Sequence, residues 1–141
     1  MLIFGGFYTS TQRFNDTFIL RLGNYQWYQP PNQKVTGEPT NAESKIGAPE
    51  PRGNHSITYH KGKVYVFGGH GGVNYSTKSF NDLLMLDCET FEWTPLEPSG
   101  TPPDPRGGHN AQIFGNQEFL MIFGGWNQMT QFQNIVLYDI S

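Results

Sequence analysis

A short apolar run that ends in a pair of glycines occurs three times in this 141-residue chain. The copies are residues 2–6 (LIFGG), 64–69 (VYVFGG) and 121–125 (MIFGG), and the first glycines of successive pairs are 63 and 56 residues apart. Self-similarity at a nearly constant period is the sequence signature of a repeat architecture. The sequence therefore predicts successive copies of one supersecondary unit, with the excess length of the longer repeat placed in loops.

Further residues fall into register when the copies are aligned on their glycine pairs. A Pro-x-Pro-Arg-Gly-x-His segment precedes two of the pairs, at residues 49–55 and 103–109. Each of the three pairs is followed by a polar loop and then by Phe-Asn-Asp or Phe-Gln-Asn. Apolar runs typical of β-strands come next, at residues 17–22, 83–87 and 135–139. Two of the units then close on a tryptophan.

This order of features resembles the kelch repeat, and the resemblance covers nearly the whole chain. It implies an all-β fold, a kelch-type β-propeller whose blades are four-stranded antiparallel sheets. Seventeen glycines, ten prolines and an aromatic content of 15% suit a protein of short strands and tight turns. Because propellers host many unrelated activities, the resemblance predicts the architecture, and the function has to be argued from a site.

On this template the chain holds about two and a half blades, an incomplete ring. Residues 1–30 form a partial blade with strands two to four, residues 31–48 a surface insertion, residues 49–97 a complete blade, and residues 98–141 a partial blade with strands one to three. The predicted strands are residues 2–6, 16–22, 25–29, 54–60, 63–68, 82–88, 91–96, 108–114, 118–123 and 134–140. Since a ring needs at least four blades, we expect the remaining blades to come from the same longer chain. Assembly of several chains into one ring is the alternative.

Residues that recur at matching repeat positions are expected to be structural. The glycine pairs need no phosphate ligand, because a dinucleotide-binding motif would require a helix after them and a loop and a strand follow here. The tryptophans are expected to pack between blades, and the histidines to fix the turn into the first strand of a blade. This structural set is Gly5, Gly6, Gly68, Gly69, Gly124, Gly125, Trp27, Trp93, His55 and His109.

Loop length distinguishes the two faces of the predicted arc. In an up-and-down blade, the loops between strands two and three and the links between blades emerge on one face. Here those loops are long and carry aromatic residues among small polar ones, a composition suited to recognition, whereas the turns on the opposite face are short. We therefore predict that the long-loop face binds a partner. Its candidate residues are Tyr8, His70, Tyr75, Trp126 and Met129.

Arg52 and Arg106, near the start of strand one, allow two interpretations. In proteins that the chain resembles, arginines at this place can reach a bound acidic peptide, and a guanidinium group matches a carboxylate well. The arginine also belongs to the repeat consensus, as a contact that stabilises the blade would require. We favour the structural interpretation and keep both residues among the candidate partner-binding residues.

Charge and composition limit the classes of function. A net charge of −3 with scattered basic residues argues against nucleic-acid binding. The sequence contains no His or Cys spacing typical of a metal site, and no cofactor is predicted. Its apolar stretches are all much shorter than the roughly 20 residues that span a membrane. The single cysteine, Cys88, has no internal disulfide partner, which favours a cytoplasmic location, including a cytoskeletal or ciliary one, over secretion.

The sequence thus predicts a non-catalytic module that binds a partner protein within a larger assembly, as a scaffold or an adaptor. The alternative is a propeller domain of a larger enzyme, either regulatory, for example attached to a phosphatase, or catalytic in the manner of galactose oxidase. A catalytic propeller of that kind would need converging Tyr and His ligands with a cross-linked Cys. Cys88 belongs to a strand end far from the long-loop face, so no catalytic residue is predicted.

Overall fold

The computed structural model describes residues 1–30, 48–72, 77–116 and 118–141, and this part of the chain consists of β-strands, turns and loops without a helix. It contains ten strands, the number predicted from the repeats. The strands are β1 (Leu2–Phe7), β2 (Arg13–Arg21), β3 (Gln26–Tyr28), β4 (Ser56–His60), β5 (Lys63–Gly71), β6 (Lys78–Asp87), β7 (Trp93–Leu96), β8 (Asn110–Phe114), β9 (Phe119–Phe123) and β10 (Ile135–Asp139).

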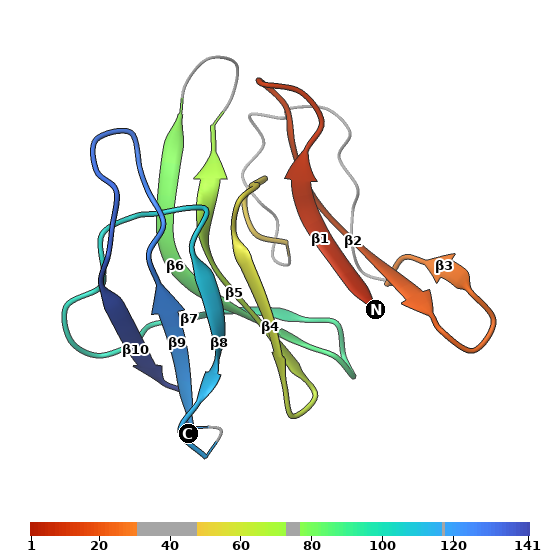
Figure 1. Ribbon diagram of the computed structural model, residues 1–141. Coiled ribbons are helices and arrows are strands. Elements are labelled where there is room, and N and C mark those ends of the chain that lie inside the picture. The colour runs from red at the N-terminus through yellow and green to blue at the C-terminus, as the bar shows by residue number, and fades with distance from the viewer. Residues whose placement is uncertain (31–47, 73–76, 117) are drawn as a thin grey trace.

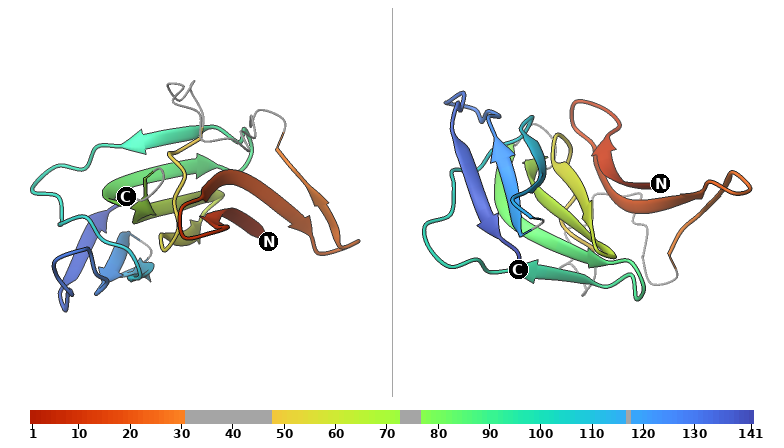
Figure 2. Two further views of the ribbon diagram at one scale, coloured as in Figure 1. Left: turned by 90° about the horizontal axis from the view of Figure 1, so that it is seen from above. Right: turned by 60° about the horizontal axis from the view of Figure 1, so that its bottom comes forward.

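The strands form three antiparallel sheets, one for each repeat. The first sheet has the order β1-β2-β3, the second β4-β5-β6-β7, and the third β10-β9-β8. In Figure 1 and Figure 2 the sheets stand side by side in chain order, as blades do in a propeller. The all-β prediction is confirmed, with one four-stranded sheet between two three-stranded ones.

The glycine pairs lie inside the first two sheets rather than at the ends of their strands. β5 continues to Gly71, three residues past the predicted end, because the register with β6 shifts between Phe67 and Gly69. Such a β-bulge bends a strand without ending its pairing. Gly68 has a φ of +61°, and a Cβ built there would lie 2.6 Å from the Arg106 carbonyl oxygen, so the backbone excludes a side chain.

β5 is buried on both faces because it lies between two neighbouring sheets. Successive side chains of a strand point to opposite faces, so Val64 and Val66 turn toward the first sheet while Tyr65 and Phe67 turn toward the third. The apolar cluster with the first sheet consists of Phe4, Val64, Val66, Leu84 and Leu86. The cluster with the third sheet consists of Tyr65, Phe67, Leu83, Leu120, Ile122 and Tyr138. The hydrophobic core therefore lies between sheets.

The two tryptophans of the structural set differ in their surroundings. Trp93 is partly buried and packs on Phe4 of the first sheet, with ring centroids 4.9 Å apart. Trp27 at the matching position is 49% exposed. Trp93 therefore contributes to the contact between two sheets, as the repeat pattern indicates.

Candidate partner-binding face

The loops of the predicted binding face lie together at one end of the sheets. The β1–β2 and β9–β10 connections are at the top in Figure 1, and the short β4–β5 and β8–β9 turns are at the bottom. Of the candidate residues, Tyr75 lies outside the described residues, as does most of the insertion at 31–48. We call this end of the sheets the top face. Its described candidate residues on the loops are Tyr8, Trp126 and Met129.

Tyr8 is presented by a hydrogen-bonded turn between β1 and β2. Its side chain is 70% exposed. The backbone N–H of Tyr8 donates to the Gln12 carbonyl at 3.1 Å, and the Thr9 hydroxyl oxygen accepts from the Gln12 N–H at 3.1 Å. The tyrosine ring also lies 5.8 Å from that of Phe14, between ring centroids. An exposed aromatic ring thus stands on a fixed loop.

Met129 occupies the tip of a second fixed turn, between β9 and β10. Its side chain is 94% exposed. The Asn127 side-chain oxygen accepts hydrogen bonds from the backbone N–H groups of Met129 and Thr130, both at 2.9 Å. The amide group of Asn127 donates to the Pro105 carbonyl at 3.2 Å and thereby anchors the turn to the preceding link. Asparagine commonly stabilises turns in this way.

Trp126 and His70 stack on each other, with ring centroids 4.2 Å apart. His70 Nε2 donates to the Trp126 carbonyl oxygen at 3.2 Å. His70 is only 5% exposed, and burial lowers the pKa of its imidazole below the usual value. Its ring fills the space beside Gly107, where a Cβ would approach it to 2.5 Å. His70 therefore supports Trp126, which keeps 45% of its surface exposed.

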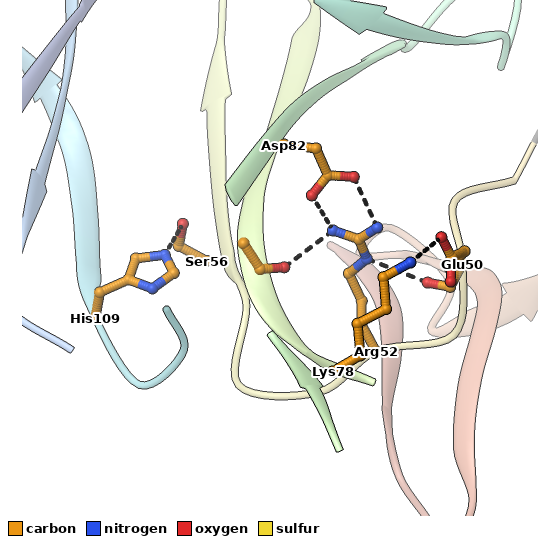
Figure 3. A network of polar contacts seen from close by, with 7 residues as sticks. Glu50, Arg52, Ser56, Lys78, Asp82 and His109 are labelled. Carbon is orange, nitrogen blue, oxygen red and sulfur yellow. Dashed lines mark hydrogen bonds and ion pairs between the residues drawn. The ribbon is translucent and has the colours of Figure 1, made fainter. Parts of the chain in front are cut away.

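Arg52 is turned into the protein, with an exposed fraction of 1%. Its Nη1 and Nη2 atoms donate to the two Asp82 carboxylate oxygens at 2.6 and 2.9 Å (Figure 3). Nη1 also donates to the Gly68 carbonyl at 3.0 Å, and Nε donates to the Glu50 carbonyl at 3.1 Å. The guanidinium carbon lies 3.9 Å from the centre of the Phe80 ring. Its charge is thus neutralised, and four of its five N–H donors form these hydrogen bonds within the second blade.

Arg106 makes the corresponding contacts in the third sheet and is also 1% exposed. Nη1 donates to the Asn134 side-chain oxygen at 2.8 Å and to the Gly124 carbonyl at 3.0 Å. Nε donates to the Asp104 carbonyl at 3.1 Å, and the guanidinium carbon lies 4.0 Å from the centre of the Phe132 ring. The third sheet thus holds its arginine with a neutral acceptor where the second sheet uses a carboxylate.

The main chain of each arginine bonds to the preceding sheet. The Arg52 N–H donates to the Phe14 carbonyl at 3.1 Å, and its carbonyl accepts from the Gly6 N–H at 2.8 Å. The Arg106 N–H likewise donates to the Phe80 carbonyl at 3.0 Å. Each arginine therefore joins two neighbouring sheets. A sequence signal for this arrangement exists, since the Phe and the Asp or Asn that contact each arginine are two residues apart in both repeats, at 28 and 30 residues after Arg52 and at 26 and 28 residues after Arg106.

His55 and His109 form a second set of repeated contacts between sheets. The His55 ring meets Phe4 edge-on at 5.2 Å, and the His109 ring meets Phe67 in the same way at 5.1 Å. His109 Nε2 also lies 2.9 Å from the Ser56 hydroxyl (Figure 3). Burial, with a further contribution from the nearby arginine, lowers the pKa of each histidine to about 4. Both rings are therefore neutral at pH 7.

The described residues contain no cluster of three His, Cys, Asp or Glu side chains that could hold a metal ion. Cys88 is partly buried, and its burial, together with the charge of Asp87, raises the pKa of the thiol. Across the same described ranges, no helix has the length and apolarity needed to cross a membrane.

The profile of one protein family matches the chain from its first residue to its last. This family is described as the KLHDC2/KLHL20/DRC7 Kelch-repeats domain, and the match covers residues 1–141. The chain belongs to the kelch-repeat family. Kelch domains of this kind are typically protein-interaction modules rather than catalytic ones.

Kelch-containing relatives differ widely in their overall roles. Host cell factor 2 of Homo sapiens is 42% identical over 84 residues, which are 55% of this chain and 10% of the relative. Acyl-CoA-binding domain-containing protein 5 of Arabidopsis thaliana is 33% identical over 92 residues, 65% of this chain and 14% of the relative. Dynein alpha chain, flagellar outer arm, of Chlamydomonas reinhardtii is 28% identical over 151 aligned positions, which cover all of this chain and 3% of the relative. The kelch chain thus spans no more than about a seventh of any of these three proteins.

Proposed function

We propose that this kelch chain binds a partner protein through the top face that carries Tyr8, Trp126 and Met129, and that it does so without catalysing a reaction. The observation that carries the proposal is the 94% exposure of Met129 on a turn that Asn127 holds with two hydrogen bonds from its side-chain oxygen. Because the turn already holds the backbone of Met129, binding of a partner there costs little backbone conformational freedom. Methionine also adapts its shape to irregular apolar surfaces.

The neighbouring residues support the same assignment. Tyr8 presents a second exposed ring on a hydrogen-bonded turn, and Trp126, whose ring centroid lies 4.2 Å from that of His70, is 45% exposed. Aromatic residues of this kind often dominate the energetics of protein interfaces. Arg52 and Arg106 are left out of the proposed contact surface, because their side chains are buried and bonded within the blades.

The relatives support a role within a larger protein or assembly. They include a host cell factor, an acyl-CoA-binding domain-containing protein and a flagellar dynein chain. Proteins of such different kinds share a kelch region. This agrees with a region that is used for interaction and not for one particular reaction. We extend the proposal to a scaffold or adaptor role, and the dynein relative makes a cytoskeletal or ciliary assembly the setting to test first.

The test is site-specific photo-cross-linking in the full-length protein in its native cells. A photoreactive residue replaces Met129 on the top face in one variant and Glu89, in the exposed turn between β6 and β7, in the matched control. We expect cross-links to a distinct protein from position 129 and none to that protein from position 89. Equal cross-linking from both positions, or links from position 129 only within the same chain, would contradict the proposal.

Substitutions then measure the contribution of the face. The Tyr8→Ala, Met129→Ala double variant is expected to reduce binding of the cross-linked protein at least tenfold, since each truncated interface anchor commonly costs about 1 kcal/mol or more. Its unfolding midpoint should stay near that of the unchanged chain because both side chains are exposed. Replacing Tyr75 and Trp126 by alanine tests the remaining predicted loop residues in the same assay.

A further inference from the structure

His70 connects the second sheet to the loop that carries Met129. Trp126 and Gln131 pair with each other at the base of that loop, and we call residues 126–131 the Met129 turn. His70 Nε2 donates to the Trp126 carbonyl oxygen at 3.2 Å. A side chain of the second sheet therefore holds the base of a turn that belongs to the third.

This hydrogen bond determines which imidazole nitrogen carries the proton. Because a carbonyl oxygen only accepts, Nε2 carries the hydrogen and Nδ1 has a lone pair. Nδ1 is buried and has no hydrogen-bond partner among the described residues, and His70 as a whole is 5% exposed. A second proton would create a buried charge and a buried N–H donor without an acceptor, and both are costly. The ring therefore fits its place only in the neutral form.

The charged groups around the ring do not offset a positive charge. Burial lowers the pKa of His70, the hydrogen bond to the main chain opposes this effect, and the charge of Arg13 on β2 lowers the pKa further. His109, just before β8, is the neighbouring titratable side chain, and it is neutral at pH 7. On β6, Ser79 and Lys78 lie opposite residues 70 and 71. Within the described ranges no carboxylate contributes to the pKa of His70.

Two arginines adjoin the glycines that contact His70. Gly53 exchanges two main-chain hydrogen bonds with residue 70, and a Cβ on Gly107 would lie 2.5 Å from the imidazole. Arg52 and Arg106 directly precede these glycines, but their guanidinium groups are hydrogen-bonded within their own blades. They supply no acceptor for a protonated imidazole. A protonated ring therefore has to turn toward water.

We propose that His70 is a positioning residue that makes partner binding at the top face dependent on pH. In the neutral form it holds the Met129 turn in the conformation described above. When Nδ1 takes a proton from solvent, the ring turns toward water, and the turn loses its hydrogen bond to the second sheet. Because the partner binds the form in which His70 is neutral, protons compete with binding, and the partner binds more weakly in acid. The inference rests on the proposed function, because its consequence is measured at the same face.

The first sheet shows which side chain can replace His70 without a titratable group. Phe7 directly follows its glycine pair, as His70 does, and it packs on Gly53 as the histidine packs on Gly107. His70→Phe therefore keeps a ring in this space, but the ring can neither take a proton nor bond to Trp126. The variant is expected to bind the partner with an affinity that no longer depends on His70 protonation, so the informative quantity is the change with pH.

The first measurement is hydrogen exchange by mass spectrometry on residues 124–132 of the full-length protein. At any one pH the intrinsic exchange rates of this segment are the same in the unchanged protein and in His70→Phe, so the ratio of the two exchange rates reports protection alone. Both proteins retain His55 and His109, so acid effects on the contacts between blades cancel as well. We expect the ratio of unchanged protein to variant to rise about three- to tenfold from pH 7.5 to pH 5.5, the upper limit being that of a water-exposed histidine with a pKa near 6.5.

The second measurement is binding of the protein that is cross-linked from position 129. Its dissociation constant for the unchanged protein should rise by about the same three- to tenfold between pH 7.5 and pH 5.5, and for His70→Phe by less than about twofold. A constant exchange ratio overturns this inference and leaves the proposed binding face intact. A rising ratio with binding that is independent of pH overturns the link between His70 and the partner. Cross-links from position 129 only within the same chain contradict the proposed function itself, whatever the exchange ratio.

The unchanged protein contains its own reference if His70→Phe fails to fold. In the β6–β7 turn the Asp87 carboxylate accepts from the N–H groups of Glu89 and Thr90 at 2.8 and 3.1 Å, much as the Asn127 side chain does in the Met129 turn. The hydrogen bonds from Thr90 and Glu89 hold the pKa of Asp87 below its usual value, so they persist from pH 7.5 to pH 5.5. Protection of the Met129 turn has to fall relative to this turn. An unchanged relative protection overturns the proposal.

Discussion

Mild acid should loosen the contacts between the blades, because two neutral histidines lie at those contacts. His55 and His109 have pKa values of about 4 in the folded protein, whereas histidine in an unfolded chain titrates near 6.5. Between these values the unfolded chain binds more protons than the folded one, so stability falls as the pH decreases. The loss begins near pH 6.5 and is complete near pH 4.

The size of the effect follows from the two shifts. Each pKa unit corresponds to about 1.4 kcal/mol, and lowering the pH from 7 to 5 covers most of the interval, so each histidine should cost about 2 kcal/mol over that range. Together the two should cost about 4 kcal/mol, a large share of the roughly 5–15 kcal/mol that stabilises an ordinary domain. The pKa of His70 is lowered as well, which adds to the same trend.

Urea unfolding followed by tryptophan fluorescence at several pH values measures this dependence. The control is the His55→Asn, His109→Asn variant, which is expected to be less stable at pH 7 but to lose much less stability between pH 7 and pH 5. The informative quantity is the slope against pH, so a general loss of stability in the variant does not obscure it. An equal slope in both proteins would refute the assignment of neutral, buried histidines to the contacts between sheets.

Three further predictions concern stability, measured by the same urea unfolding at pH 7. Arg52→Ala should cost about 1–3 kcal/mol, because it leaves the buried Gly68 carbonyl without its donor and removes the guanidinium group from the Phe80 ring, whereas solvent partly screens Asp82, whose side chain is 41% exposed; Arg52→Lys should rescue little of this, and a full rescue would argue against the bidentate contact. Trp93→Ala should cost about 2 kcal/mol and Trp27→Ala less than about 1 kcal/mol, since only Trp93 packs on a neighbouring sheet; equal costs would contradict the described packing. Gly68→Ala should destabilise more than Gly62→Ala, because the two glycines have similar positive φ values of +61° and +77° but a Cβ meets the Arg106 carbonyl only at Gly68, whereas nothing lies within 4 Å at Gly62; equal effects would place the cost in φ alone.

The sequence predicted the number of strands and their order because each repeat carries its own local signals. Apolar β-prone runs and turn residues define strands over a few residues, and repetition of the pattern reinforced each assignment. The continuation of β5 past its glycine pair was not predicted. A pair of glycines in a sequence indicates the end of a strand. In the structure the strand continues, and the register shift with β6 and the Arg106 carbonyl beside Gly68 identify the glycine pair as a β-bulge.

The roles of the candidate site residues depend on contacts that a linear pattern does not contain. Tyr8 and Met129 could be proposed from loop composition, and both are exposed on the loops where the pattern placed them. His70 directly follows a glycine pair, as Phe7 and Trp126 do, but its burial arises from Gly107, 37 positions away. The contact of His70 with Gly107 follows from the packing of one sheet on the next, and His70 does not recur at its repeat position, so the repeat pattern gave no signal for it.

The arginine links have a consequence for synthesis on the ribosome. The Phe14 carbonyl in the first sheet accepts from the N–H of Arg52, and the Phe80 carbonyl in the second accepts from the N–H of Arg106. The chain emerges from the ribosome with its N-terminus first. Each blade therefore completes its hydrogen bonds only after the first residues of the next repeat have been synthesised. If translation pauses at the end of a repeat, the last blade still lacks the main-chain hydrogen bond from the arginine of the next repeat. Each blade is therefore complete only after the next Pro-x-Pro-Arg segment has been translated.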